Sequence, residues 1–367
     1  YMCSAMADLA VECEDTEMLE ACKRLWDSTV NHRMYLTGGI GSSGFRERFT
    51  TDYDLPNTTN YSETCASIGL MMFGQRMSAA TGEAGYYDTV ELALYNTVLA
   101  GINRAGDRYF YVNPLEVVPE FCTEHTYMDH VKAVRQKWFS VACCPPNVAR
   151  TLASLGQYIY AQEENAVCIH QFISSTAKAV LESGTVEIGM ESTLLQDSKV
   201  KIRTRQDGEV TFKIRRPGYA GKQEITVDGQ TAKAVLEKGY LLCIDFGVKP
   251  RWIAANDEVR ADAGRCALMN GPVVYCLEET DNGKYLADLY VEENTEVTKG
   301  NPQTDLPGEI PTLQYEATRI HNRSTEQGNL YGELKLEKEQ MHLTAVPYGL
   351  WCNRTPGEML VWVKVKV

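Results

Sequence analysis

Three features that the sequence lacks narrow its class. It has no apolar run of about 18 residues, so no segment is long enough to span a bilayer. It has no surplus of positive charge, because 49 acidic residues against 36 basic ones give a net charge of −13. Twelve cysteines among 367 residues are too dilute for a disulfide scaffold and many for a secreted enzyme. We therefore expect a globular protein of two or three domains, with no nucleic-acid or membrane partner.

The chain also begins without an initiator Met or a signal peptide. Met2, Met6, Leu9 and Ala10 already have helical spacing. A natural N-terminus rarely opens inside an amphipathic helix without a capping residue. We therefore expect this sequence to be the C-terminal part of a longer protein, and it leaves any signal peptide on that protein undefined.

Up to about residue 160, apolar residues recur with the spacing of amphipathic helices. Loops that contain Gly, Pro or Asn separate the helical segments. Repeated helix–loop–helix units favour helical hairpins that pack as a toroid or barrel. The predicted helices after the first span residues 16–32, 62–80, 86–100 and 146–160.

After about residue 165, apolar and polar residues alternate, which is typical of strands with one buried face. Asp228-Gly229 is a signal for a tight hairpin turn. Short strands with frequent turns favour β-sandwich domains, and a break at 261–264 divides two of them. Residues 280–340 are polar and rich in loops, and their pattern predicts no element. The clearest predicted strands are 185–190, 200–204, 210–214, 224–227, 241–246, 273–277 and 359–367.

A glycine-rich segment, Leu36-Thr-Gly-Gly-Ile-Gly-Ser42, is followed by Phe45-Arg-Glu47. Three glycines in four residues indicate either backbone close to a ligand or a sharp turn after a helix. The segment is neither a phosphate-binding loop nor a dinucleotide fingerprint, because its spacing differs and no strand precedes it.

The cysteines are the strongest chemical signal. Cys143 and Cys144 are adjacent and precede two prolines, so we expect an extended Cys144 just before a helix N-terminus, where amides favour a thiolate. Adjacent cysteines are strained as a mutual disulfide. With Glu63 and Cys65 they would supply the four ligands of a tetrahedral zinc site. The spacing alone leaves a second interpretation open, in which these are unrelated buried cysteines.

Several motifs, in the same order along the whole chain, resemble those of one enzyme family. They are Leu36-Thr-Gly-Gly-Ile-Gly-Ser42, Tyr53-Asp-Leu-Pro-Asn57, Glu63-Thr-Cys65, Tyr95-Asn96, Tyr109-Phe-Tyr-Val-Asn-Pro114, Cys143-Cys-Pro-Pro-Asn147 and Pro356-Gly-Glu-Met-Leu-Val361. Together they resemble glycoside hydrolase family 127, whose characterised activity is β-L-arabinofuranosidase. The Glu-x-Cys and Cys-Cys-Pro-Pro-Asn elements are specific when they occur together.

The resemblance implies a multidomain α + β fold. Residues 1–162 would be the C-terminal part of an (α/α)6 catalytic barrel, incomplete at its N-terminus. Residues 163–262 and 263–367 would be two β-sandwich domains. Sugar-binding histidines would lie in barrel helices that precede Tyr1, so this chain alone is expected to lack the complete pocket.

The resemblance also implies the roles of individual residues. Zn²⁺ would be held by Glu63, Cys65, Cys143 and Cys144. Cys143 would be the nucleophile and Glu47 the general acid/base of a retaining enzyme that releases non-reducing terminal β-L-arabinofuranose. The substrate would be an arabinofuranosyl oligosaccharide or glycoconjugate. We further expect Glu91 and Tyr111 to contact the sugar.

The chemistry of these groups is consistent with that mechanism. Retaining cleavage needs an acid at the leaving oxygen and a nucleophile on the other face of the sugar. A free thiol, with a pKa of about 8.5, is mostly protonated at pH 7, and coordination to zinc removes its proton. Three thiolates and one carboxylate around a divalent cation sum to 2 − 4 = −2, which favours the positive charge that develops on the sugar ring.

Two other functions remain open at this stage. One is a glycosidase of another specificity that uses a carboxylate pair, Glu47 with Asp52 or Asp54. The other is a sugar-binding protein without activity, in which the zinc site is structural. Unpaired thiolates survive best in a reducing compartment, so we expect a cytoplasmic protein, and we expect a homodimer as its assembly.

Overall fold

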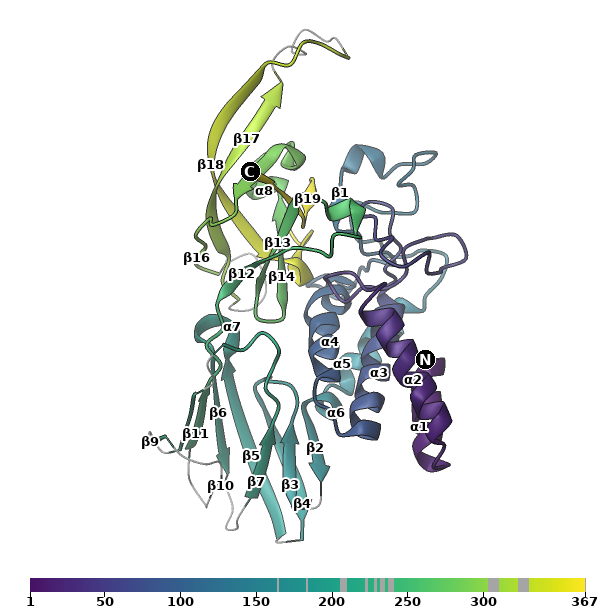
Figure 1. Ribbon diagram of the computed structural model, residues 1–367, viewed down its shortest axis with the longest axis vertical. Helices are drawn as coiled ribbons and strands as arrows, with labels where there is room; N and C mark the ends of the chain where they lie inside the picture. The colour runs from purple at the N-terminus through teal and green to yellow at the C-terminus, as the bar shows by residue number, and fades with distance from the viewer. Residues whose placement is uncertain are drawn as a thin grey trace.

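The chain has a mixed fold in which helices lie on one side and β-sheets on the other (Figure 1). The first 160 residues form the long helices, and nearly all strands and several short helices follow them. The computed structural model describes residues 1–163, 165–182, 184–204, 210–221, 224–227, 230–231, 235–236, 241–302, 310–322 and 330–366.

The helices occur where the apolar spacing predicts them. Asp15 begins α2 because its side chain accepts a hydrogen bond from the backbone N–H of Met18 at 2.9 Å. Gly82 ends α3 in the left-handed conformation. α3 packs against α1, α4 and α5. The helices are α1 (Met2–Glu12), α2 (Thr16–Val30), α3 (Thr64–Thr81), α4 (Tyr86–Ala93), the π-helix η1 (Leu94–Val98), α5 (Cys144–Ala153) and α6 (Gly156–Ile159).

One helix begins earlier than predicted. α5 has Cys144 as its first residue and Cys143 as its N-cap, with φ −71° and ψ −38° at Cys143. The expectation of an extended Cys144 before the helix is therefore wrong. The two prolines lie in the first turn, where backbone N–H groups have no acceptor inside the helix. Their missing N–H groups therefore cost no helical hydrogen bond.

Two sheets follow the helices and share one hydrophobic core. The four-stranded sheet has the order β10-β7-β3-β2, and the six-stranded sheet has the order β4-β5-β6-β11-β8-β9. β8 and β9 pair across Asp228-Gly229, although these two residues lie outside the described part of the chain. The strands are β2 (Tyr160–Glu163), β3 (Ala166–Ile169), β4 (Ser175–Leu181), β5 (Gly184–Thr193), β6 (Lys199–Thr204), β7 (Val210–Ile214), β8 (Glu224–Val227), β9 (Gln230–Thr231), β10 (Val235–Leu236) and β11 (Leu241–Asp245), with the short helix α7 (Leu194–Asp197) between β5 and β6.

The C-terminal sheet closes on itself. Its order runs β1-β19-β14-β18-β17-β15-β20-β13-β12, and β13 also pairs with β14, so six of its strands form a barrel-like ring. β13 and β14 are buried on both faces, toward the interior of the ring and toward the loops of the helical part. The strands are β1 (Glu116–Val117), β12 (Pro250–Ile253), β13 (Arg265–Asn270), β14 (Val273–Glu278), β15 (Leu289–Glu292), β16 (Thr298–Lys299), β17 (Leu313–Asn322), β18 (Leu336–Pro347), β19 (Met359–Leu360) and β20 (Val363–Lys366).

The segment 280–340, for which the pattern predicts no element, contains part of a long hairpin. β17 and β18 pair over ten residue positions, and they extend beyond the body of the molecule (Figure 1). The remaining helices of the described residues are short. They are η2 (Pro119–Phe121), η3 (Arg260–Asp262), α8 (Glu279–Asn282), η4 (Leu286–Asp288) and η6 (Tyr348–Leu350).

The helical part is tied to both β units by buried polar contacts. Asn96 donates to the carbonyl of Pro272 at 2.9 Å and accepts from the N–H of Val274 at 2.8 Å. Arg215, after β7, forms ion pairs with Asp88 and with Glu91 of α4. These contacts fix α4 and η1 relative to the sheets.

The domain boundaries at 162 and 262 stay a prediction. None of the helices in the described residues combines the length and apolar character that crossing a bilayer requires.

We expect Arg215→Met to lower the free energy of unfolding by about 3–5 kcal/mol, because it leaves the buried Glu91 carboxylate without its counter-ion. Chemical denaturation measures this loss. Arg203→Met removes an exposed ion pair with Glu191 and serves as the control, with an expected loss of less than about 1 kcal/mol. Equal losses in the two variants would contradict the anchoring role of Arg215.

Candidate metal centre and active site

Two helix N-termini bring four ligand-type side chains together. Glu63 is the N-cap of α3, and Cys65 lies in the first turn of that helix. Cys143 is the N-cap of α5, and Cys144 is its first residue. Helix N-termini carry partial positive charge, so both helices favour negative charge at this point.

The four ligand atoms are close enough to share one metal ion, and three of their separations match a tetrahedral site. Their ligand atoms all lie within 4.8 Å of one another. Cys144 Sγ lies 3.5 Å from Cys65 Sγ and 3.8 Å from Cys143 Sγ, and Glu63 Oε1 lies 3.4 Å from Cys143 Sγ. With metal–sulfur bonds of about 2.3 Å and metal–oxygen bonds of about 2.1 Å, tetrahedral angles require edges of roughly 3.5–3.8 Å. The donor set therefore fits one metal ion, and the predicted ligands converge.

One side of the cluster is closed and the other is open. Cys65 and Cys144 are buried and pack with Tyr109 and Phe139. Asn147 donates a hydrogen bond to Cys65 Sγ at 3.0 Å. Cys143, in contrast, is exposed. The cluster thus presents one sulfur outward, unlike a fully enclosed structural site.

The ionisation of the four groups is coupled. Burial raises the pKa of Cys143 to about 11, and burial also raises the pKa of Glu63. Hydrogen bonding between Cys65 and Cys144 lowers the pKa of Cys65 and raises that of Cys144. Without a cation, four acidic groups this close cannot all be deprotonated, because their negative charges repel. A bound cation favours the deprotonated forms.

Glu47 lies on the exposed loop between α2 and α3, beside this cluster. Glu47 Oε1 accepts hydrogen bonds from the hydroxyls of Tyr61 at 2.9 Å and Tyr111 at 3.3 Å. The Tyr61 and Tyr111 rings meet edge to face, with centroids 5.8 Å apart. Tyr111 also interacts with Cys143 and Glu63. Tyr111 therefore lies between Glu47 and the sulfur ligands.

A cavity of about 460 Å³ lies beside the cluster, a size that suits a small ligand. Glu63, Cys65, Cys143 and Asn147 form part of its wall, together with the apolar side chains of Ile40, Leu70 and Phe73.

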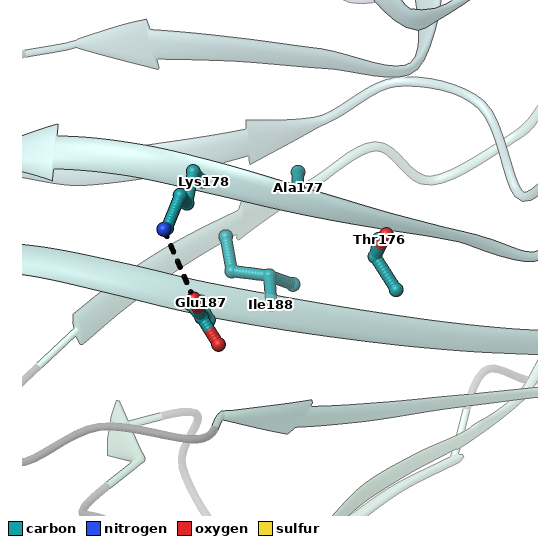
Figure 2. Close-up of a pocket in the computed structure, with 5 residues that line it drawn as sticks. All are labelled: Thr176, Ala177, Lys178, Glu187 and Ile188. Atoms are coloured by element: carbon teal, nitrogen blue, oxygen red, sulfur yellow. Dashed lines mark ion pairs between the residues drawn. The ribbon is translucent and has the colours of Figure 1, made fainter.

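Figure 2 shows a different hollow, on the surface of β4 and β5. The Lys178–Glu187 ion pair of 3.2 Å joins the two strands there, and the other lining residues are Thr176, Ala177 and Ile188. Its lining has one carboxylate and neither cysteine nor histidine, so it lacks the metal-binding and nucleophilic side chains of the cysteine cluster.

The glycine-rich segment supports the site through close packing. A Cβ on Gly38 would lie 2.5 Å from Ala93 Cα, and one on Gly39 would lie 2.7 Å from Ser62 Oγ. Gly38 also has a positive φ of 73°. The segment does form a sharp turn, in which the N–H of Gly38 donates to the carbonyl of Tyr35 at 2.9 Å, but it is not a helix C-cap, because α2 ends at Val30 with Asn31 as its C-cap. These glycines let the loop approach α4 and the residue before Glu63.

Glu91 is not brought to this cluster. It is completely buried, and its carboxylate accepts hydrogen bonds from Arg215 at 2.5 Å and Tyr219 at 3.0 Å. In this structure the carboxylate has no exposed surface, and its Oε2 is bonded to two side chains. This geometry does not support a sugar contact, so that role of Glu91 stays a prediction; the observed contacts join α4 to the β-sheets.

Two residues near the cluster received no role from the sequence. Tyr61 precedes Ser62-Glu63, and Asn147 ends Cys143-Cys-Pro-Pro-Asn147. Their position in motifs that carry ligands was the only available signal, because their partners Glu47 and Cys65 lie 14 and 82 residues away.

Family comparisons match almost the whole chain. Residues 2–157 match the β-L-arabinofuranosidase, GH127 catalytic domain; residues 166–256 match the β-L-arabinofuranosidase, GH127 middle domain; residues 250–364 match the glycoside hydrolase family 127 C-terminal domain. A curated relative is the non-reducing end β-L-arabinofuranosidase of Bifidobacterium longum subsp. longum. It is 36% identical over 388 residues, which cover 99% of this chain and 58% of the relative.

Solved structures are similar over the whole chain as well. The crystal structure of a GH127 β-L-arabinofuranosidase from Geobacillus stearothermophilus T6 has a TM-score of 0.94 and 39% identity, covering 100% of this chain and 60% of that one. A second GH127 β-arabinofuranosidase has a TM-score of 0.89 and 29% identity, with coverage of 100% and 59%. The chain thus spans between 58% and 60% of the length of these three relatives.

We expect the reduced protein to bind about one divalent metal ion per chain, because its four donor atoms match a single tetrahedral site. Elemental analysis after gel filtration measures the stoichiometry. The double variant Cys65→Ser/Cys144→Ser should lose the metal. Cys13→Ser, which changes an exposed cysteine outside the cluster, should retain it. Equal metal content in both variants would contradict the assignment.

Proposed function

Because this chain belongs to glycoside hydrolase family 127, we propose that it carries the catalytic centre of a retaining glycoside hydrolase that releases non-reducing terminal β-L-arabinofuranose. The observation that carries this proposal is the four-ligand cluster with one exposed sulfur beside Glu47. Since the chain spans between 58% and 60% of its relatives, the activity is proposed for the whole protein.

In this proposal the helical part is the C-terminal portion of an (α/α)6 barrel, followed by two β-sandwich domains. The high structural similarity to the GH127 relatives supports this architecture. The barrel-like ring of the C-terminal sheet is a more closed arrangement than a simple sandwich.

The proposed metal is Zn²⁺, held by Glu63, Cys65, Cys143 and Cys144. Three sulfur donors and one carboxylate oxygen suit zinc better than magnesium or calcium, which prefer oxygen ligands. When bound, the ion would keep the Cys143 thiol deprotonated and nucleophilic.

Cys143 is the proposed nucleophile because its sulfur is the exposed one. The thiolate attacks the anomeric carbon, so a carbon–sulfur bond forms while the bond to the leaving oxygen breaks. Glu47 donates its proton to that oxygen, and the leaving group departs as a neutral alcohol. Glu47 then takes a proton from water, whose oxygen attacks the same carbon and releases the Cys143 thiolate.

Tyr111 is the proposed sugar contact. Its hydroxyl lies 3.3 Å from Glu47 Oε1 and also interacts with Cys143 and Glu63. A sugar bound between the nucleophile and the acid/base would therefore lie against this side chain.

The carboxylate-pair alternative has weaker support. Asp52 forms an ion pair with Arg33 at 2.6 Å, and Asp54 is exposed. Among the described residues, neither carboxylate accepts a hydrogen bond from Tyr61 or Tyr111, as Glu47 does. A purely structural zinc site would also have four protein ligands. The cavity of about 460 Å³ lined by Glu63 and Cys143, together with the exposed sulfur of Cys143, favours a catalytic role instead.

The proposed substrate is an arabinofuranosyl oligosaccharide or glycoconjugate. The homodimer and the cytoplasmic location stay predictions.

Cys143→Ser in the full-length protein should lower turnover of synthetic β-L-arabinofuranosides by at least about 10³-fold, since a serine hydroxyl is a far weaker nucleophile than a thiolate. Release of L-arabinose measures the loss, and circular dichroism checks that the fold is retained.

Asp52→Asn and Asp54→Asn are the matched controls for Cys143→Ser. Both should keep near-normal turnover. Full activity in Cys143→Ser together with loss of activity in either aspartate variant would instead support the carboxylate pair.

Glu47→Gln should lower kcat/KM by about 10²–10⁴-fold on substrates with a poor leaving group, because the proton donor is lost. Its metal content should stay unchanged, since Glu47 is outside the ligand set. Unaltered hydrolysis of an alkyl β-L-arabinofuranoside would rule out Glu47 as the acid.

A further inference from the structure

Tyr61 contacts the loop that carries Glu47 at three points. Its backbone N–H donates to the carbonyl of Gly41 at 3.0 Å. Its ring covers Gly44, where an added Cβ would lie 3.3 Å from Tyr61 Cδ2. Its hydroxyl donates to Glu47 Oε1 at 2.9 Å. Tyr61 therefore contacts the base of the loop through its backbone, and the turn and the carboxylate through its half-buried side chain.

The loop depends on such support. Arg46 and Glu47 have φ values of 58° and 51°, a left-handed conformation that side chains other than glycine rarely adopt. The Glu47 side chain is exposed, so packing does not restrict its rotamers. The backbones of Ser43 and Arg48 form an antiparallel β-bridge at the base of the turn, and this bridge does not restrain the Glu47 carboxylate.

Both tyrosine hydroxyls donate to the same carboxylate oxygen. Tyr61 and Tyr111 bond Oε1 of Glu47, and no hydrogen bond from the described residues reaches Oε2. An oxygen that already accepts two hydrogen bonds is a poor place for a proton. Oε2 is therefore the oxygen left to carry a proton toward a leaving group.

Tyr61 also connects the acid/base to the ligands of the metal site. The next residue, Ser62, donates its N–H to the carbonyl of Gly41 at 2.9 Å, and Glu63 and Cys65 follow directly. One segment of five residues thus fixes Glu47 through Tyr61 and presents two ligands. This arrangement sets the separation between the acid/base and the sulfur nucleophile.

We propose that Tyr61 is a positioning residue, whose hydroxyl holds Glu47 Oε1 so that Oε2 delivers the proton to the leaving oxygen and later receives one from water. The proposal rests on the proposed glycosidase function. The hydrogen bond from Tyr111 to Glu47 is the longer one, and Tyr111 also contacts Cys143, so Tyr111 restrains Glu47 less than Tyr61 does.

Tyr61→Phe tests this proposal in the full-length, metal-loaded protein, because it keeps the ring on Gly44 and removes only the hydroxyl. Proton donation matters for an alkoxide leaving group and little for 4-nitrophenolate. We expect kcat/KM to fall at least about tenfold on methyl β-L-arabinofuranoside and less than about threefold on the 4-nitrophenyl substrate. Metal content should not change. Equal losses on both substrates, or no loss on either, would overturn the proposal.

Tyr127→Phe is the matched control, since Tyr127 is exposed and lies outside the site, and it should leave both substrates unaffected. Crystal structures of the wild-type and Tyr61→Phe proteins give a second readout that needs no activity. The Glu47 carboxylate should shift or become disordered while Glu63 stays in place, and an unmoved Glu47 would overturn the positioning role. If the wild-type protein cleaves neither substrate, the proposed function fails, and this structural comparison still decides whether Tyr61 holds Glu47.

Discussion

The site depends on one constraint: three sulfur atoms and one carboxylate oxygen are held within 4.8 Å of one another by the N-termini of α3 and α5. Without a cation this arrangement is unfavourable, because four acidic groups at this distance resist ionisation. With one, the same arrangement yields a sulfur that is both deprotonated and exposed. The helix ends supply additional positive potential and fixed positions.

Much of the surrounding structure keeps these two helix ends together. The Thr64 hydroxyl donates to the carbonyl of Phe110, and Asn113 donates to both Thr64 and Ser62, all at 2.9 Å. Tyr109 donates to the carbonyl of Val141, two residues before Cys143. The extended segment 109–114 thus connects two pairs of ligands that are about 80 residues apart in sequence. Its own position is fixed by the core that it shares with the C-terminal sheet.

Residue type and periodicity were sufficient to predict the helices and most of the strands. The four ligands were predicted only when the cysteine positions were combined with the family resemblance. Sequence patterns were insufficient where the outcome depended on distant partners. The carboxylate of Glu91 is bonded to Arg215, 124 residues away, which nothing in the local pattern indicates. The first half of β18, from Leu336 to Gln340, is exposed on both faces, so it lacks the alternation that identifies a strand. The hold of Tyr61 on Glu47 requires a left-handed turn that composition does not predict.

The account rests on a metal held by three sulfurs and one oxygen. X-ray absorption at the zinc K-edge of the metal-loaded, full-length protein tests it most directly. The account predicts three sulfur neighbours at about 2.3 Å and one oxygen at about 2.0–2.2 Å. A first shell of nitrogen and oxygen alone, or the same spectrum in a Cys143→Ser variant, would contradict it.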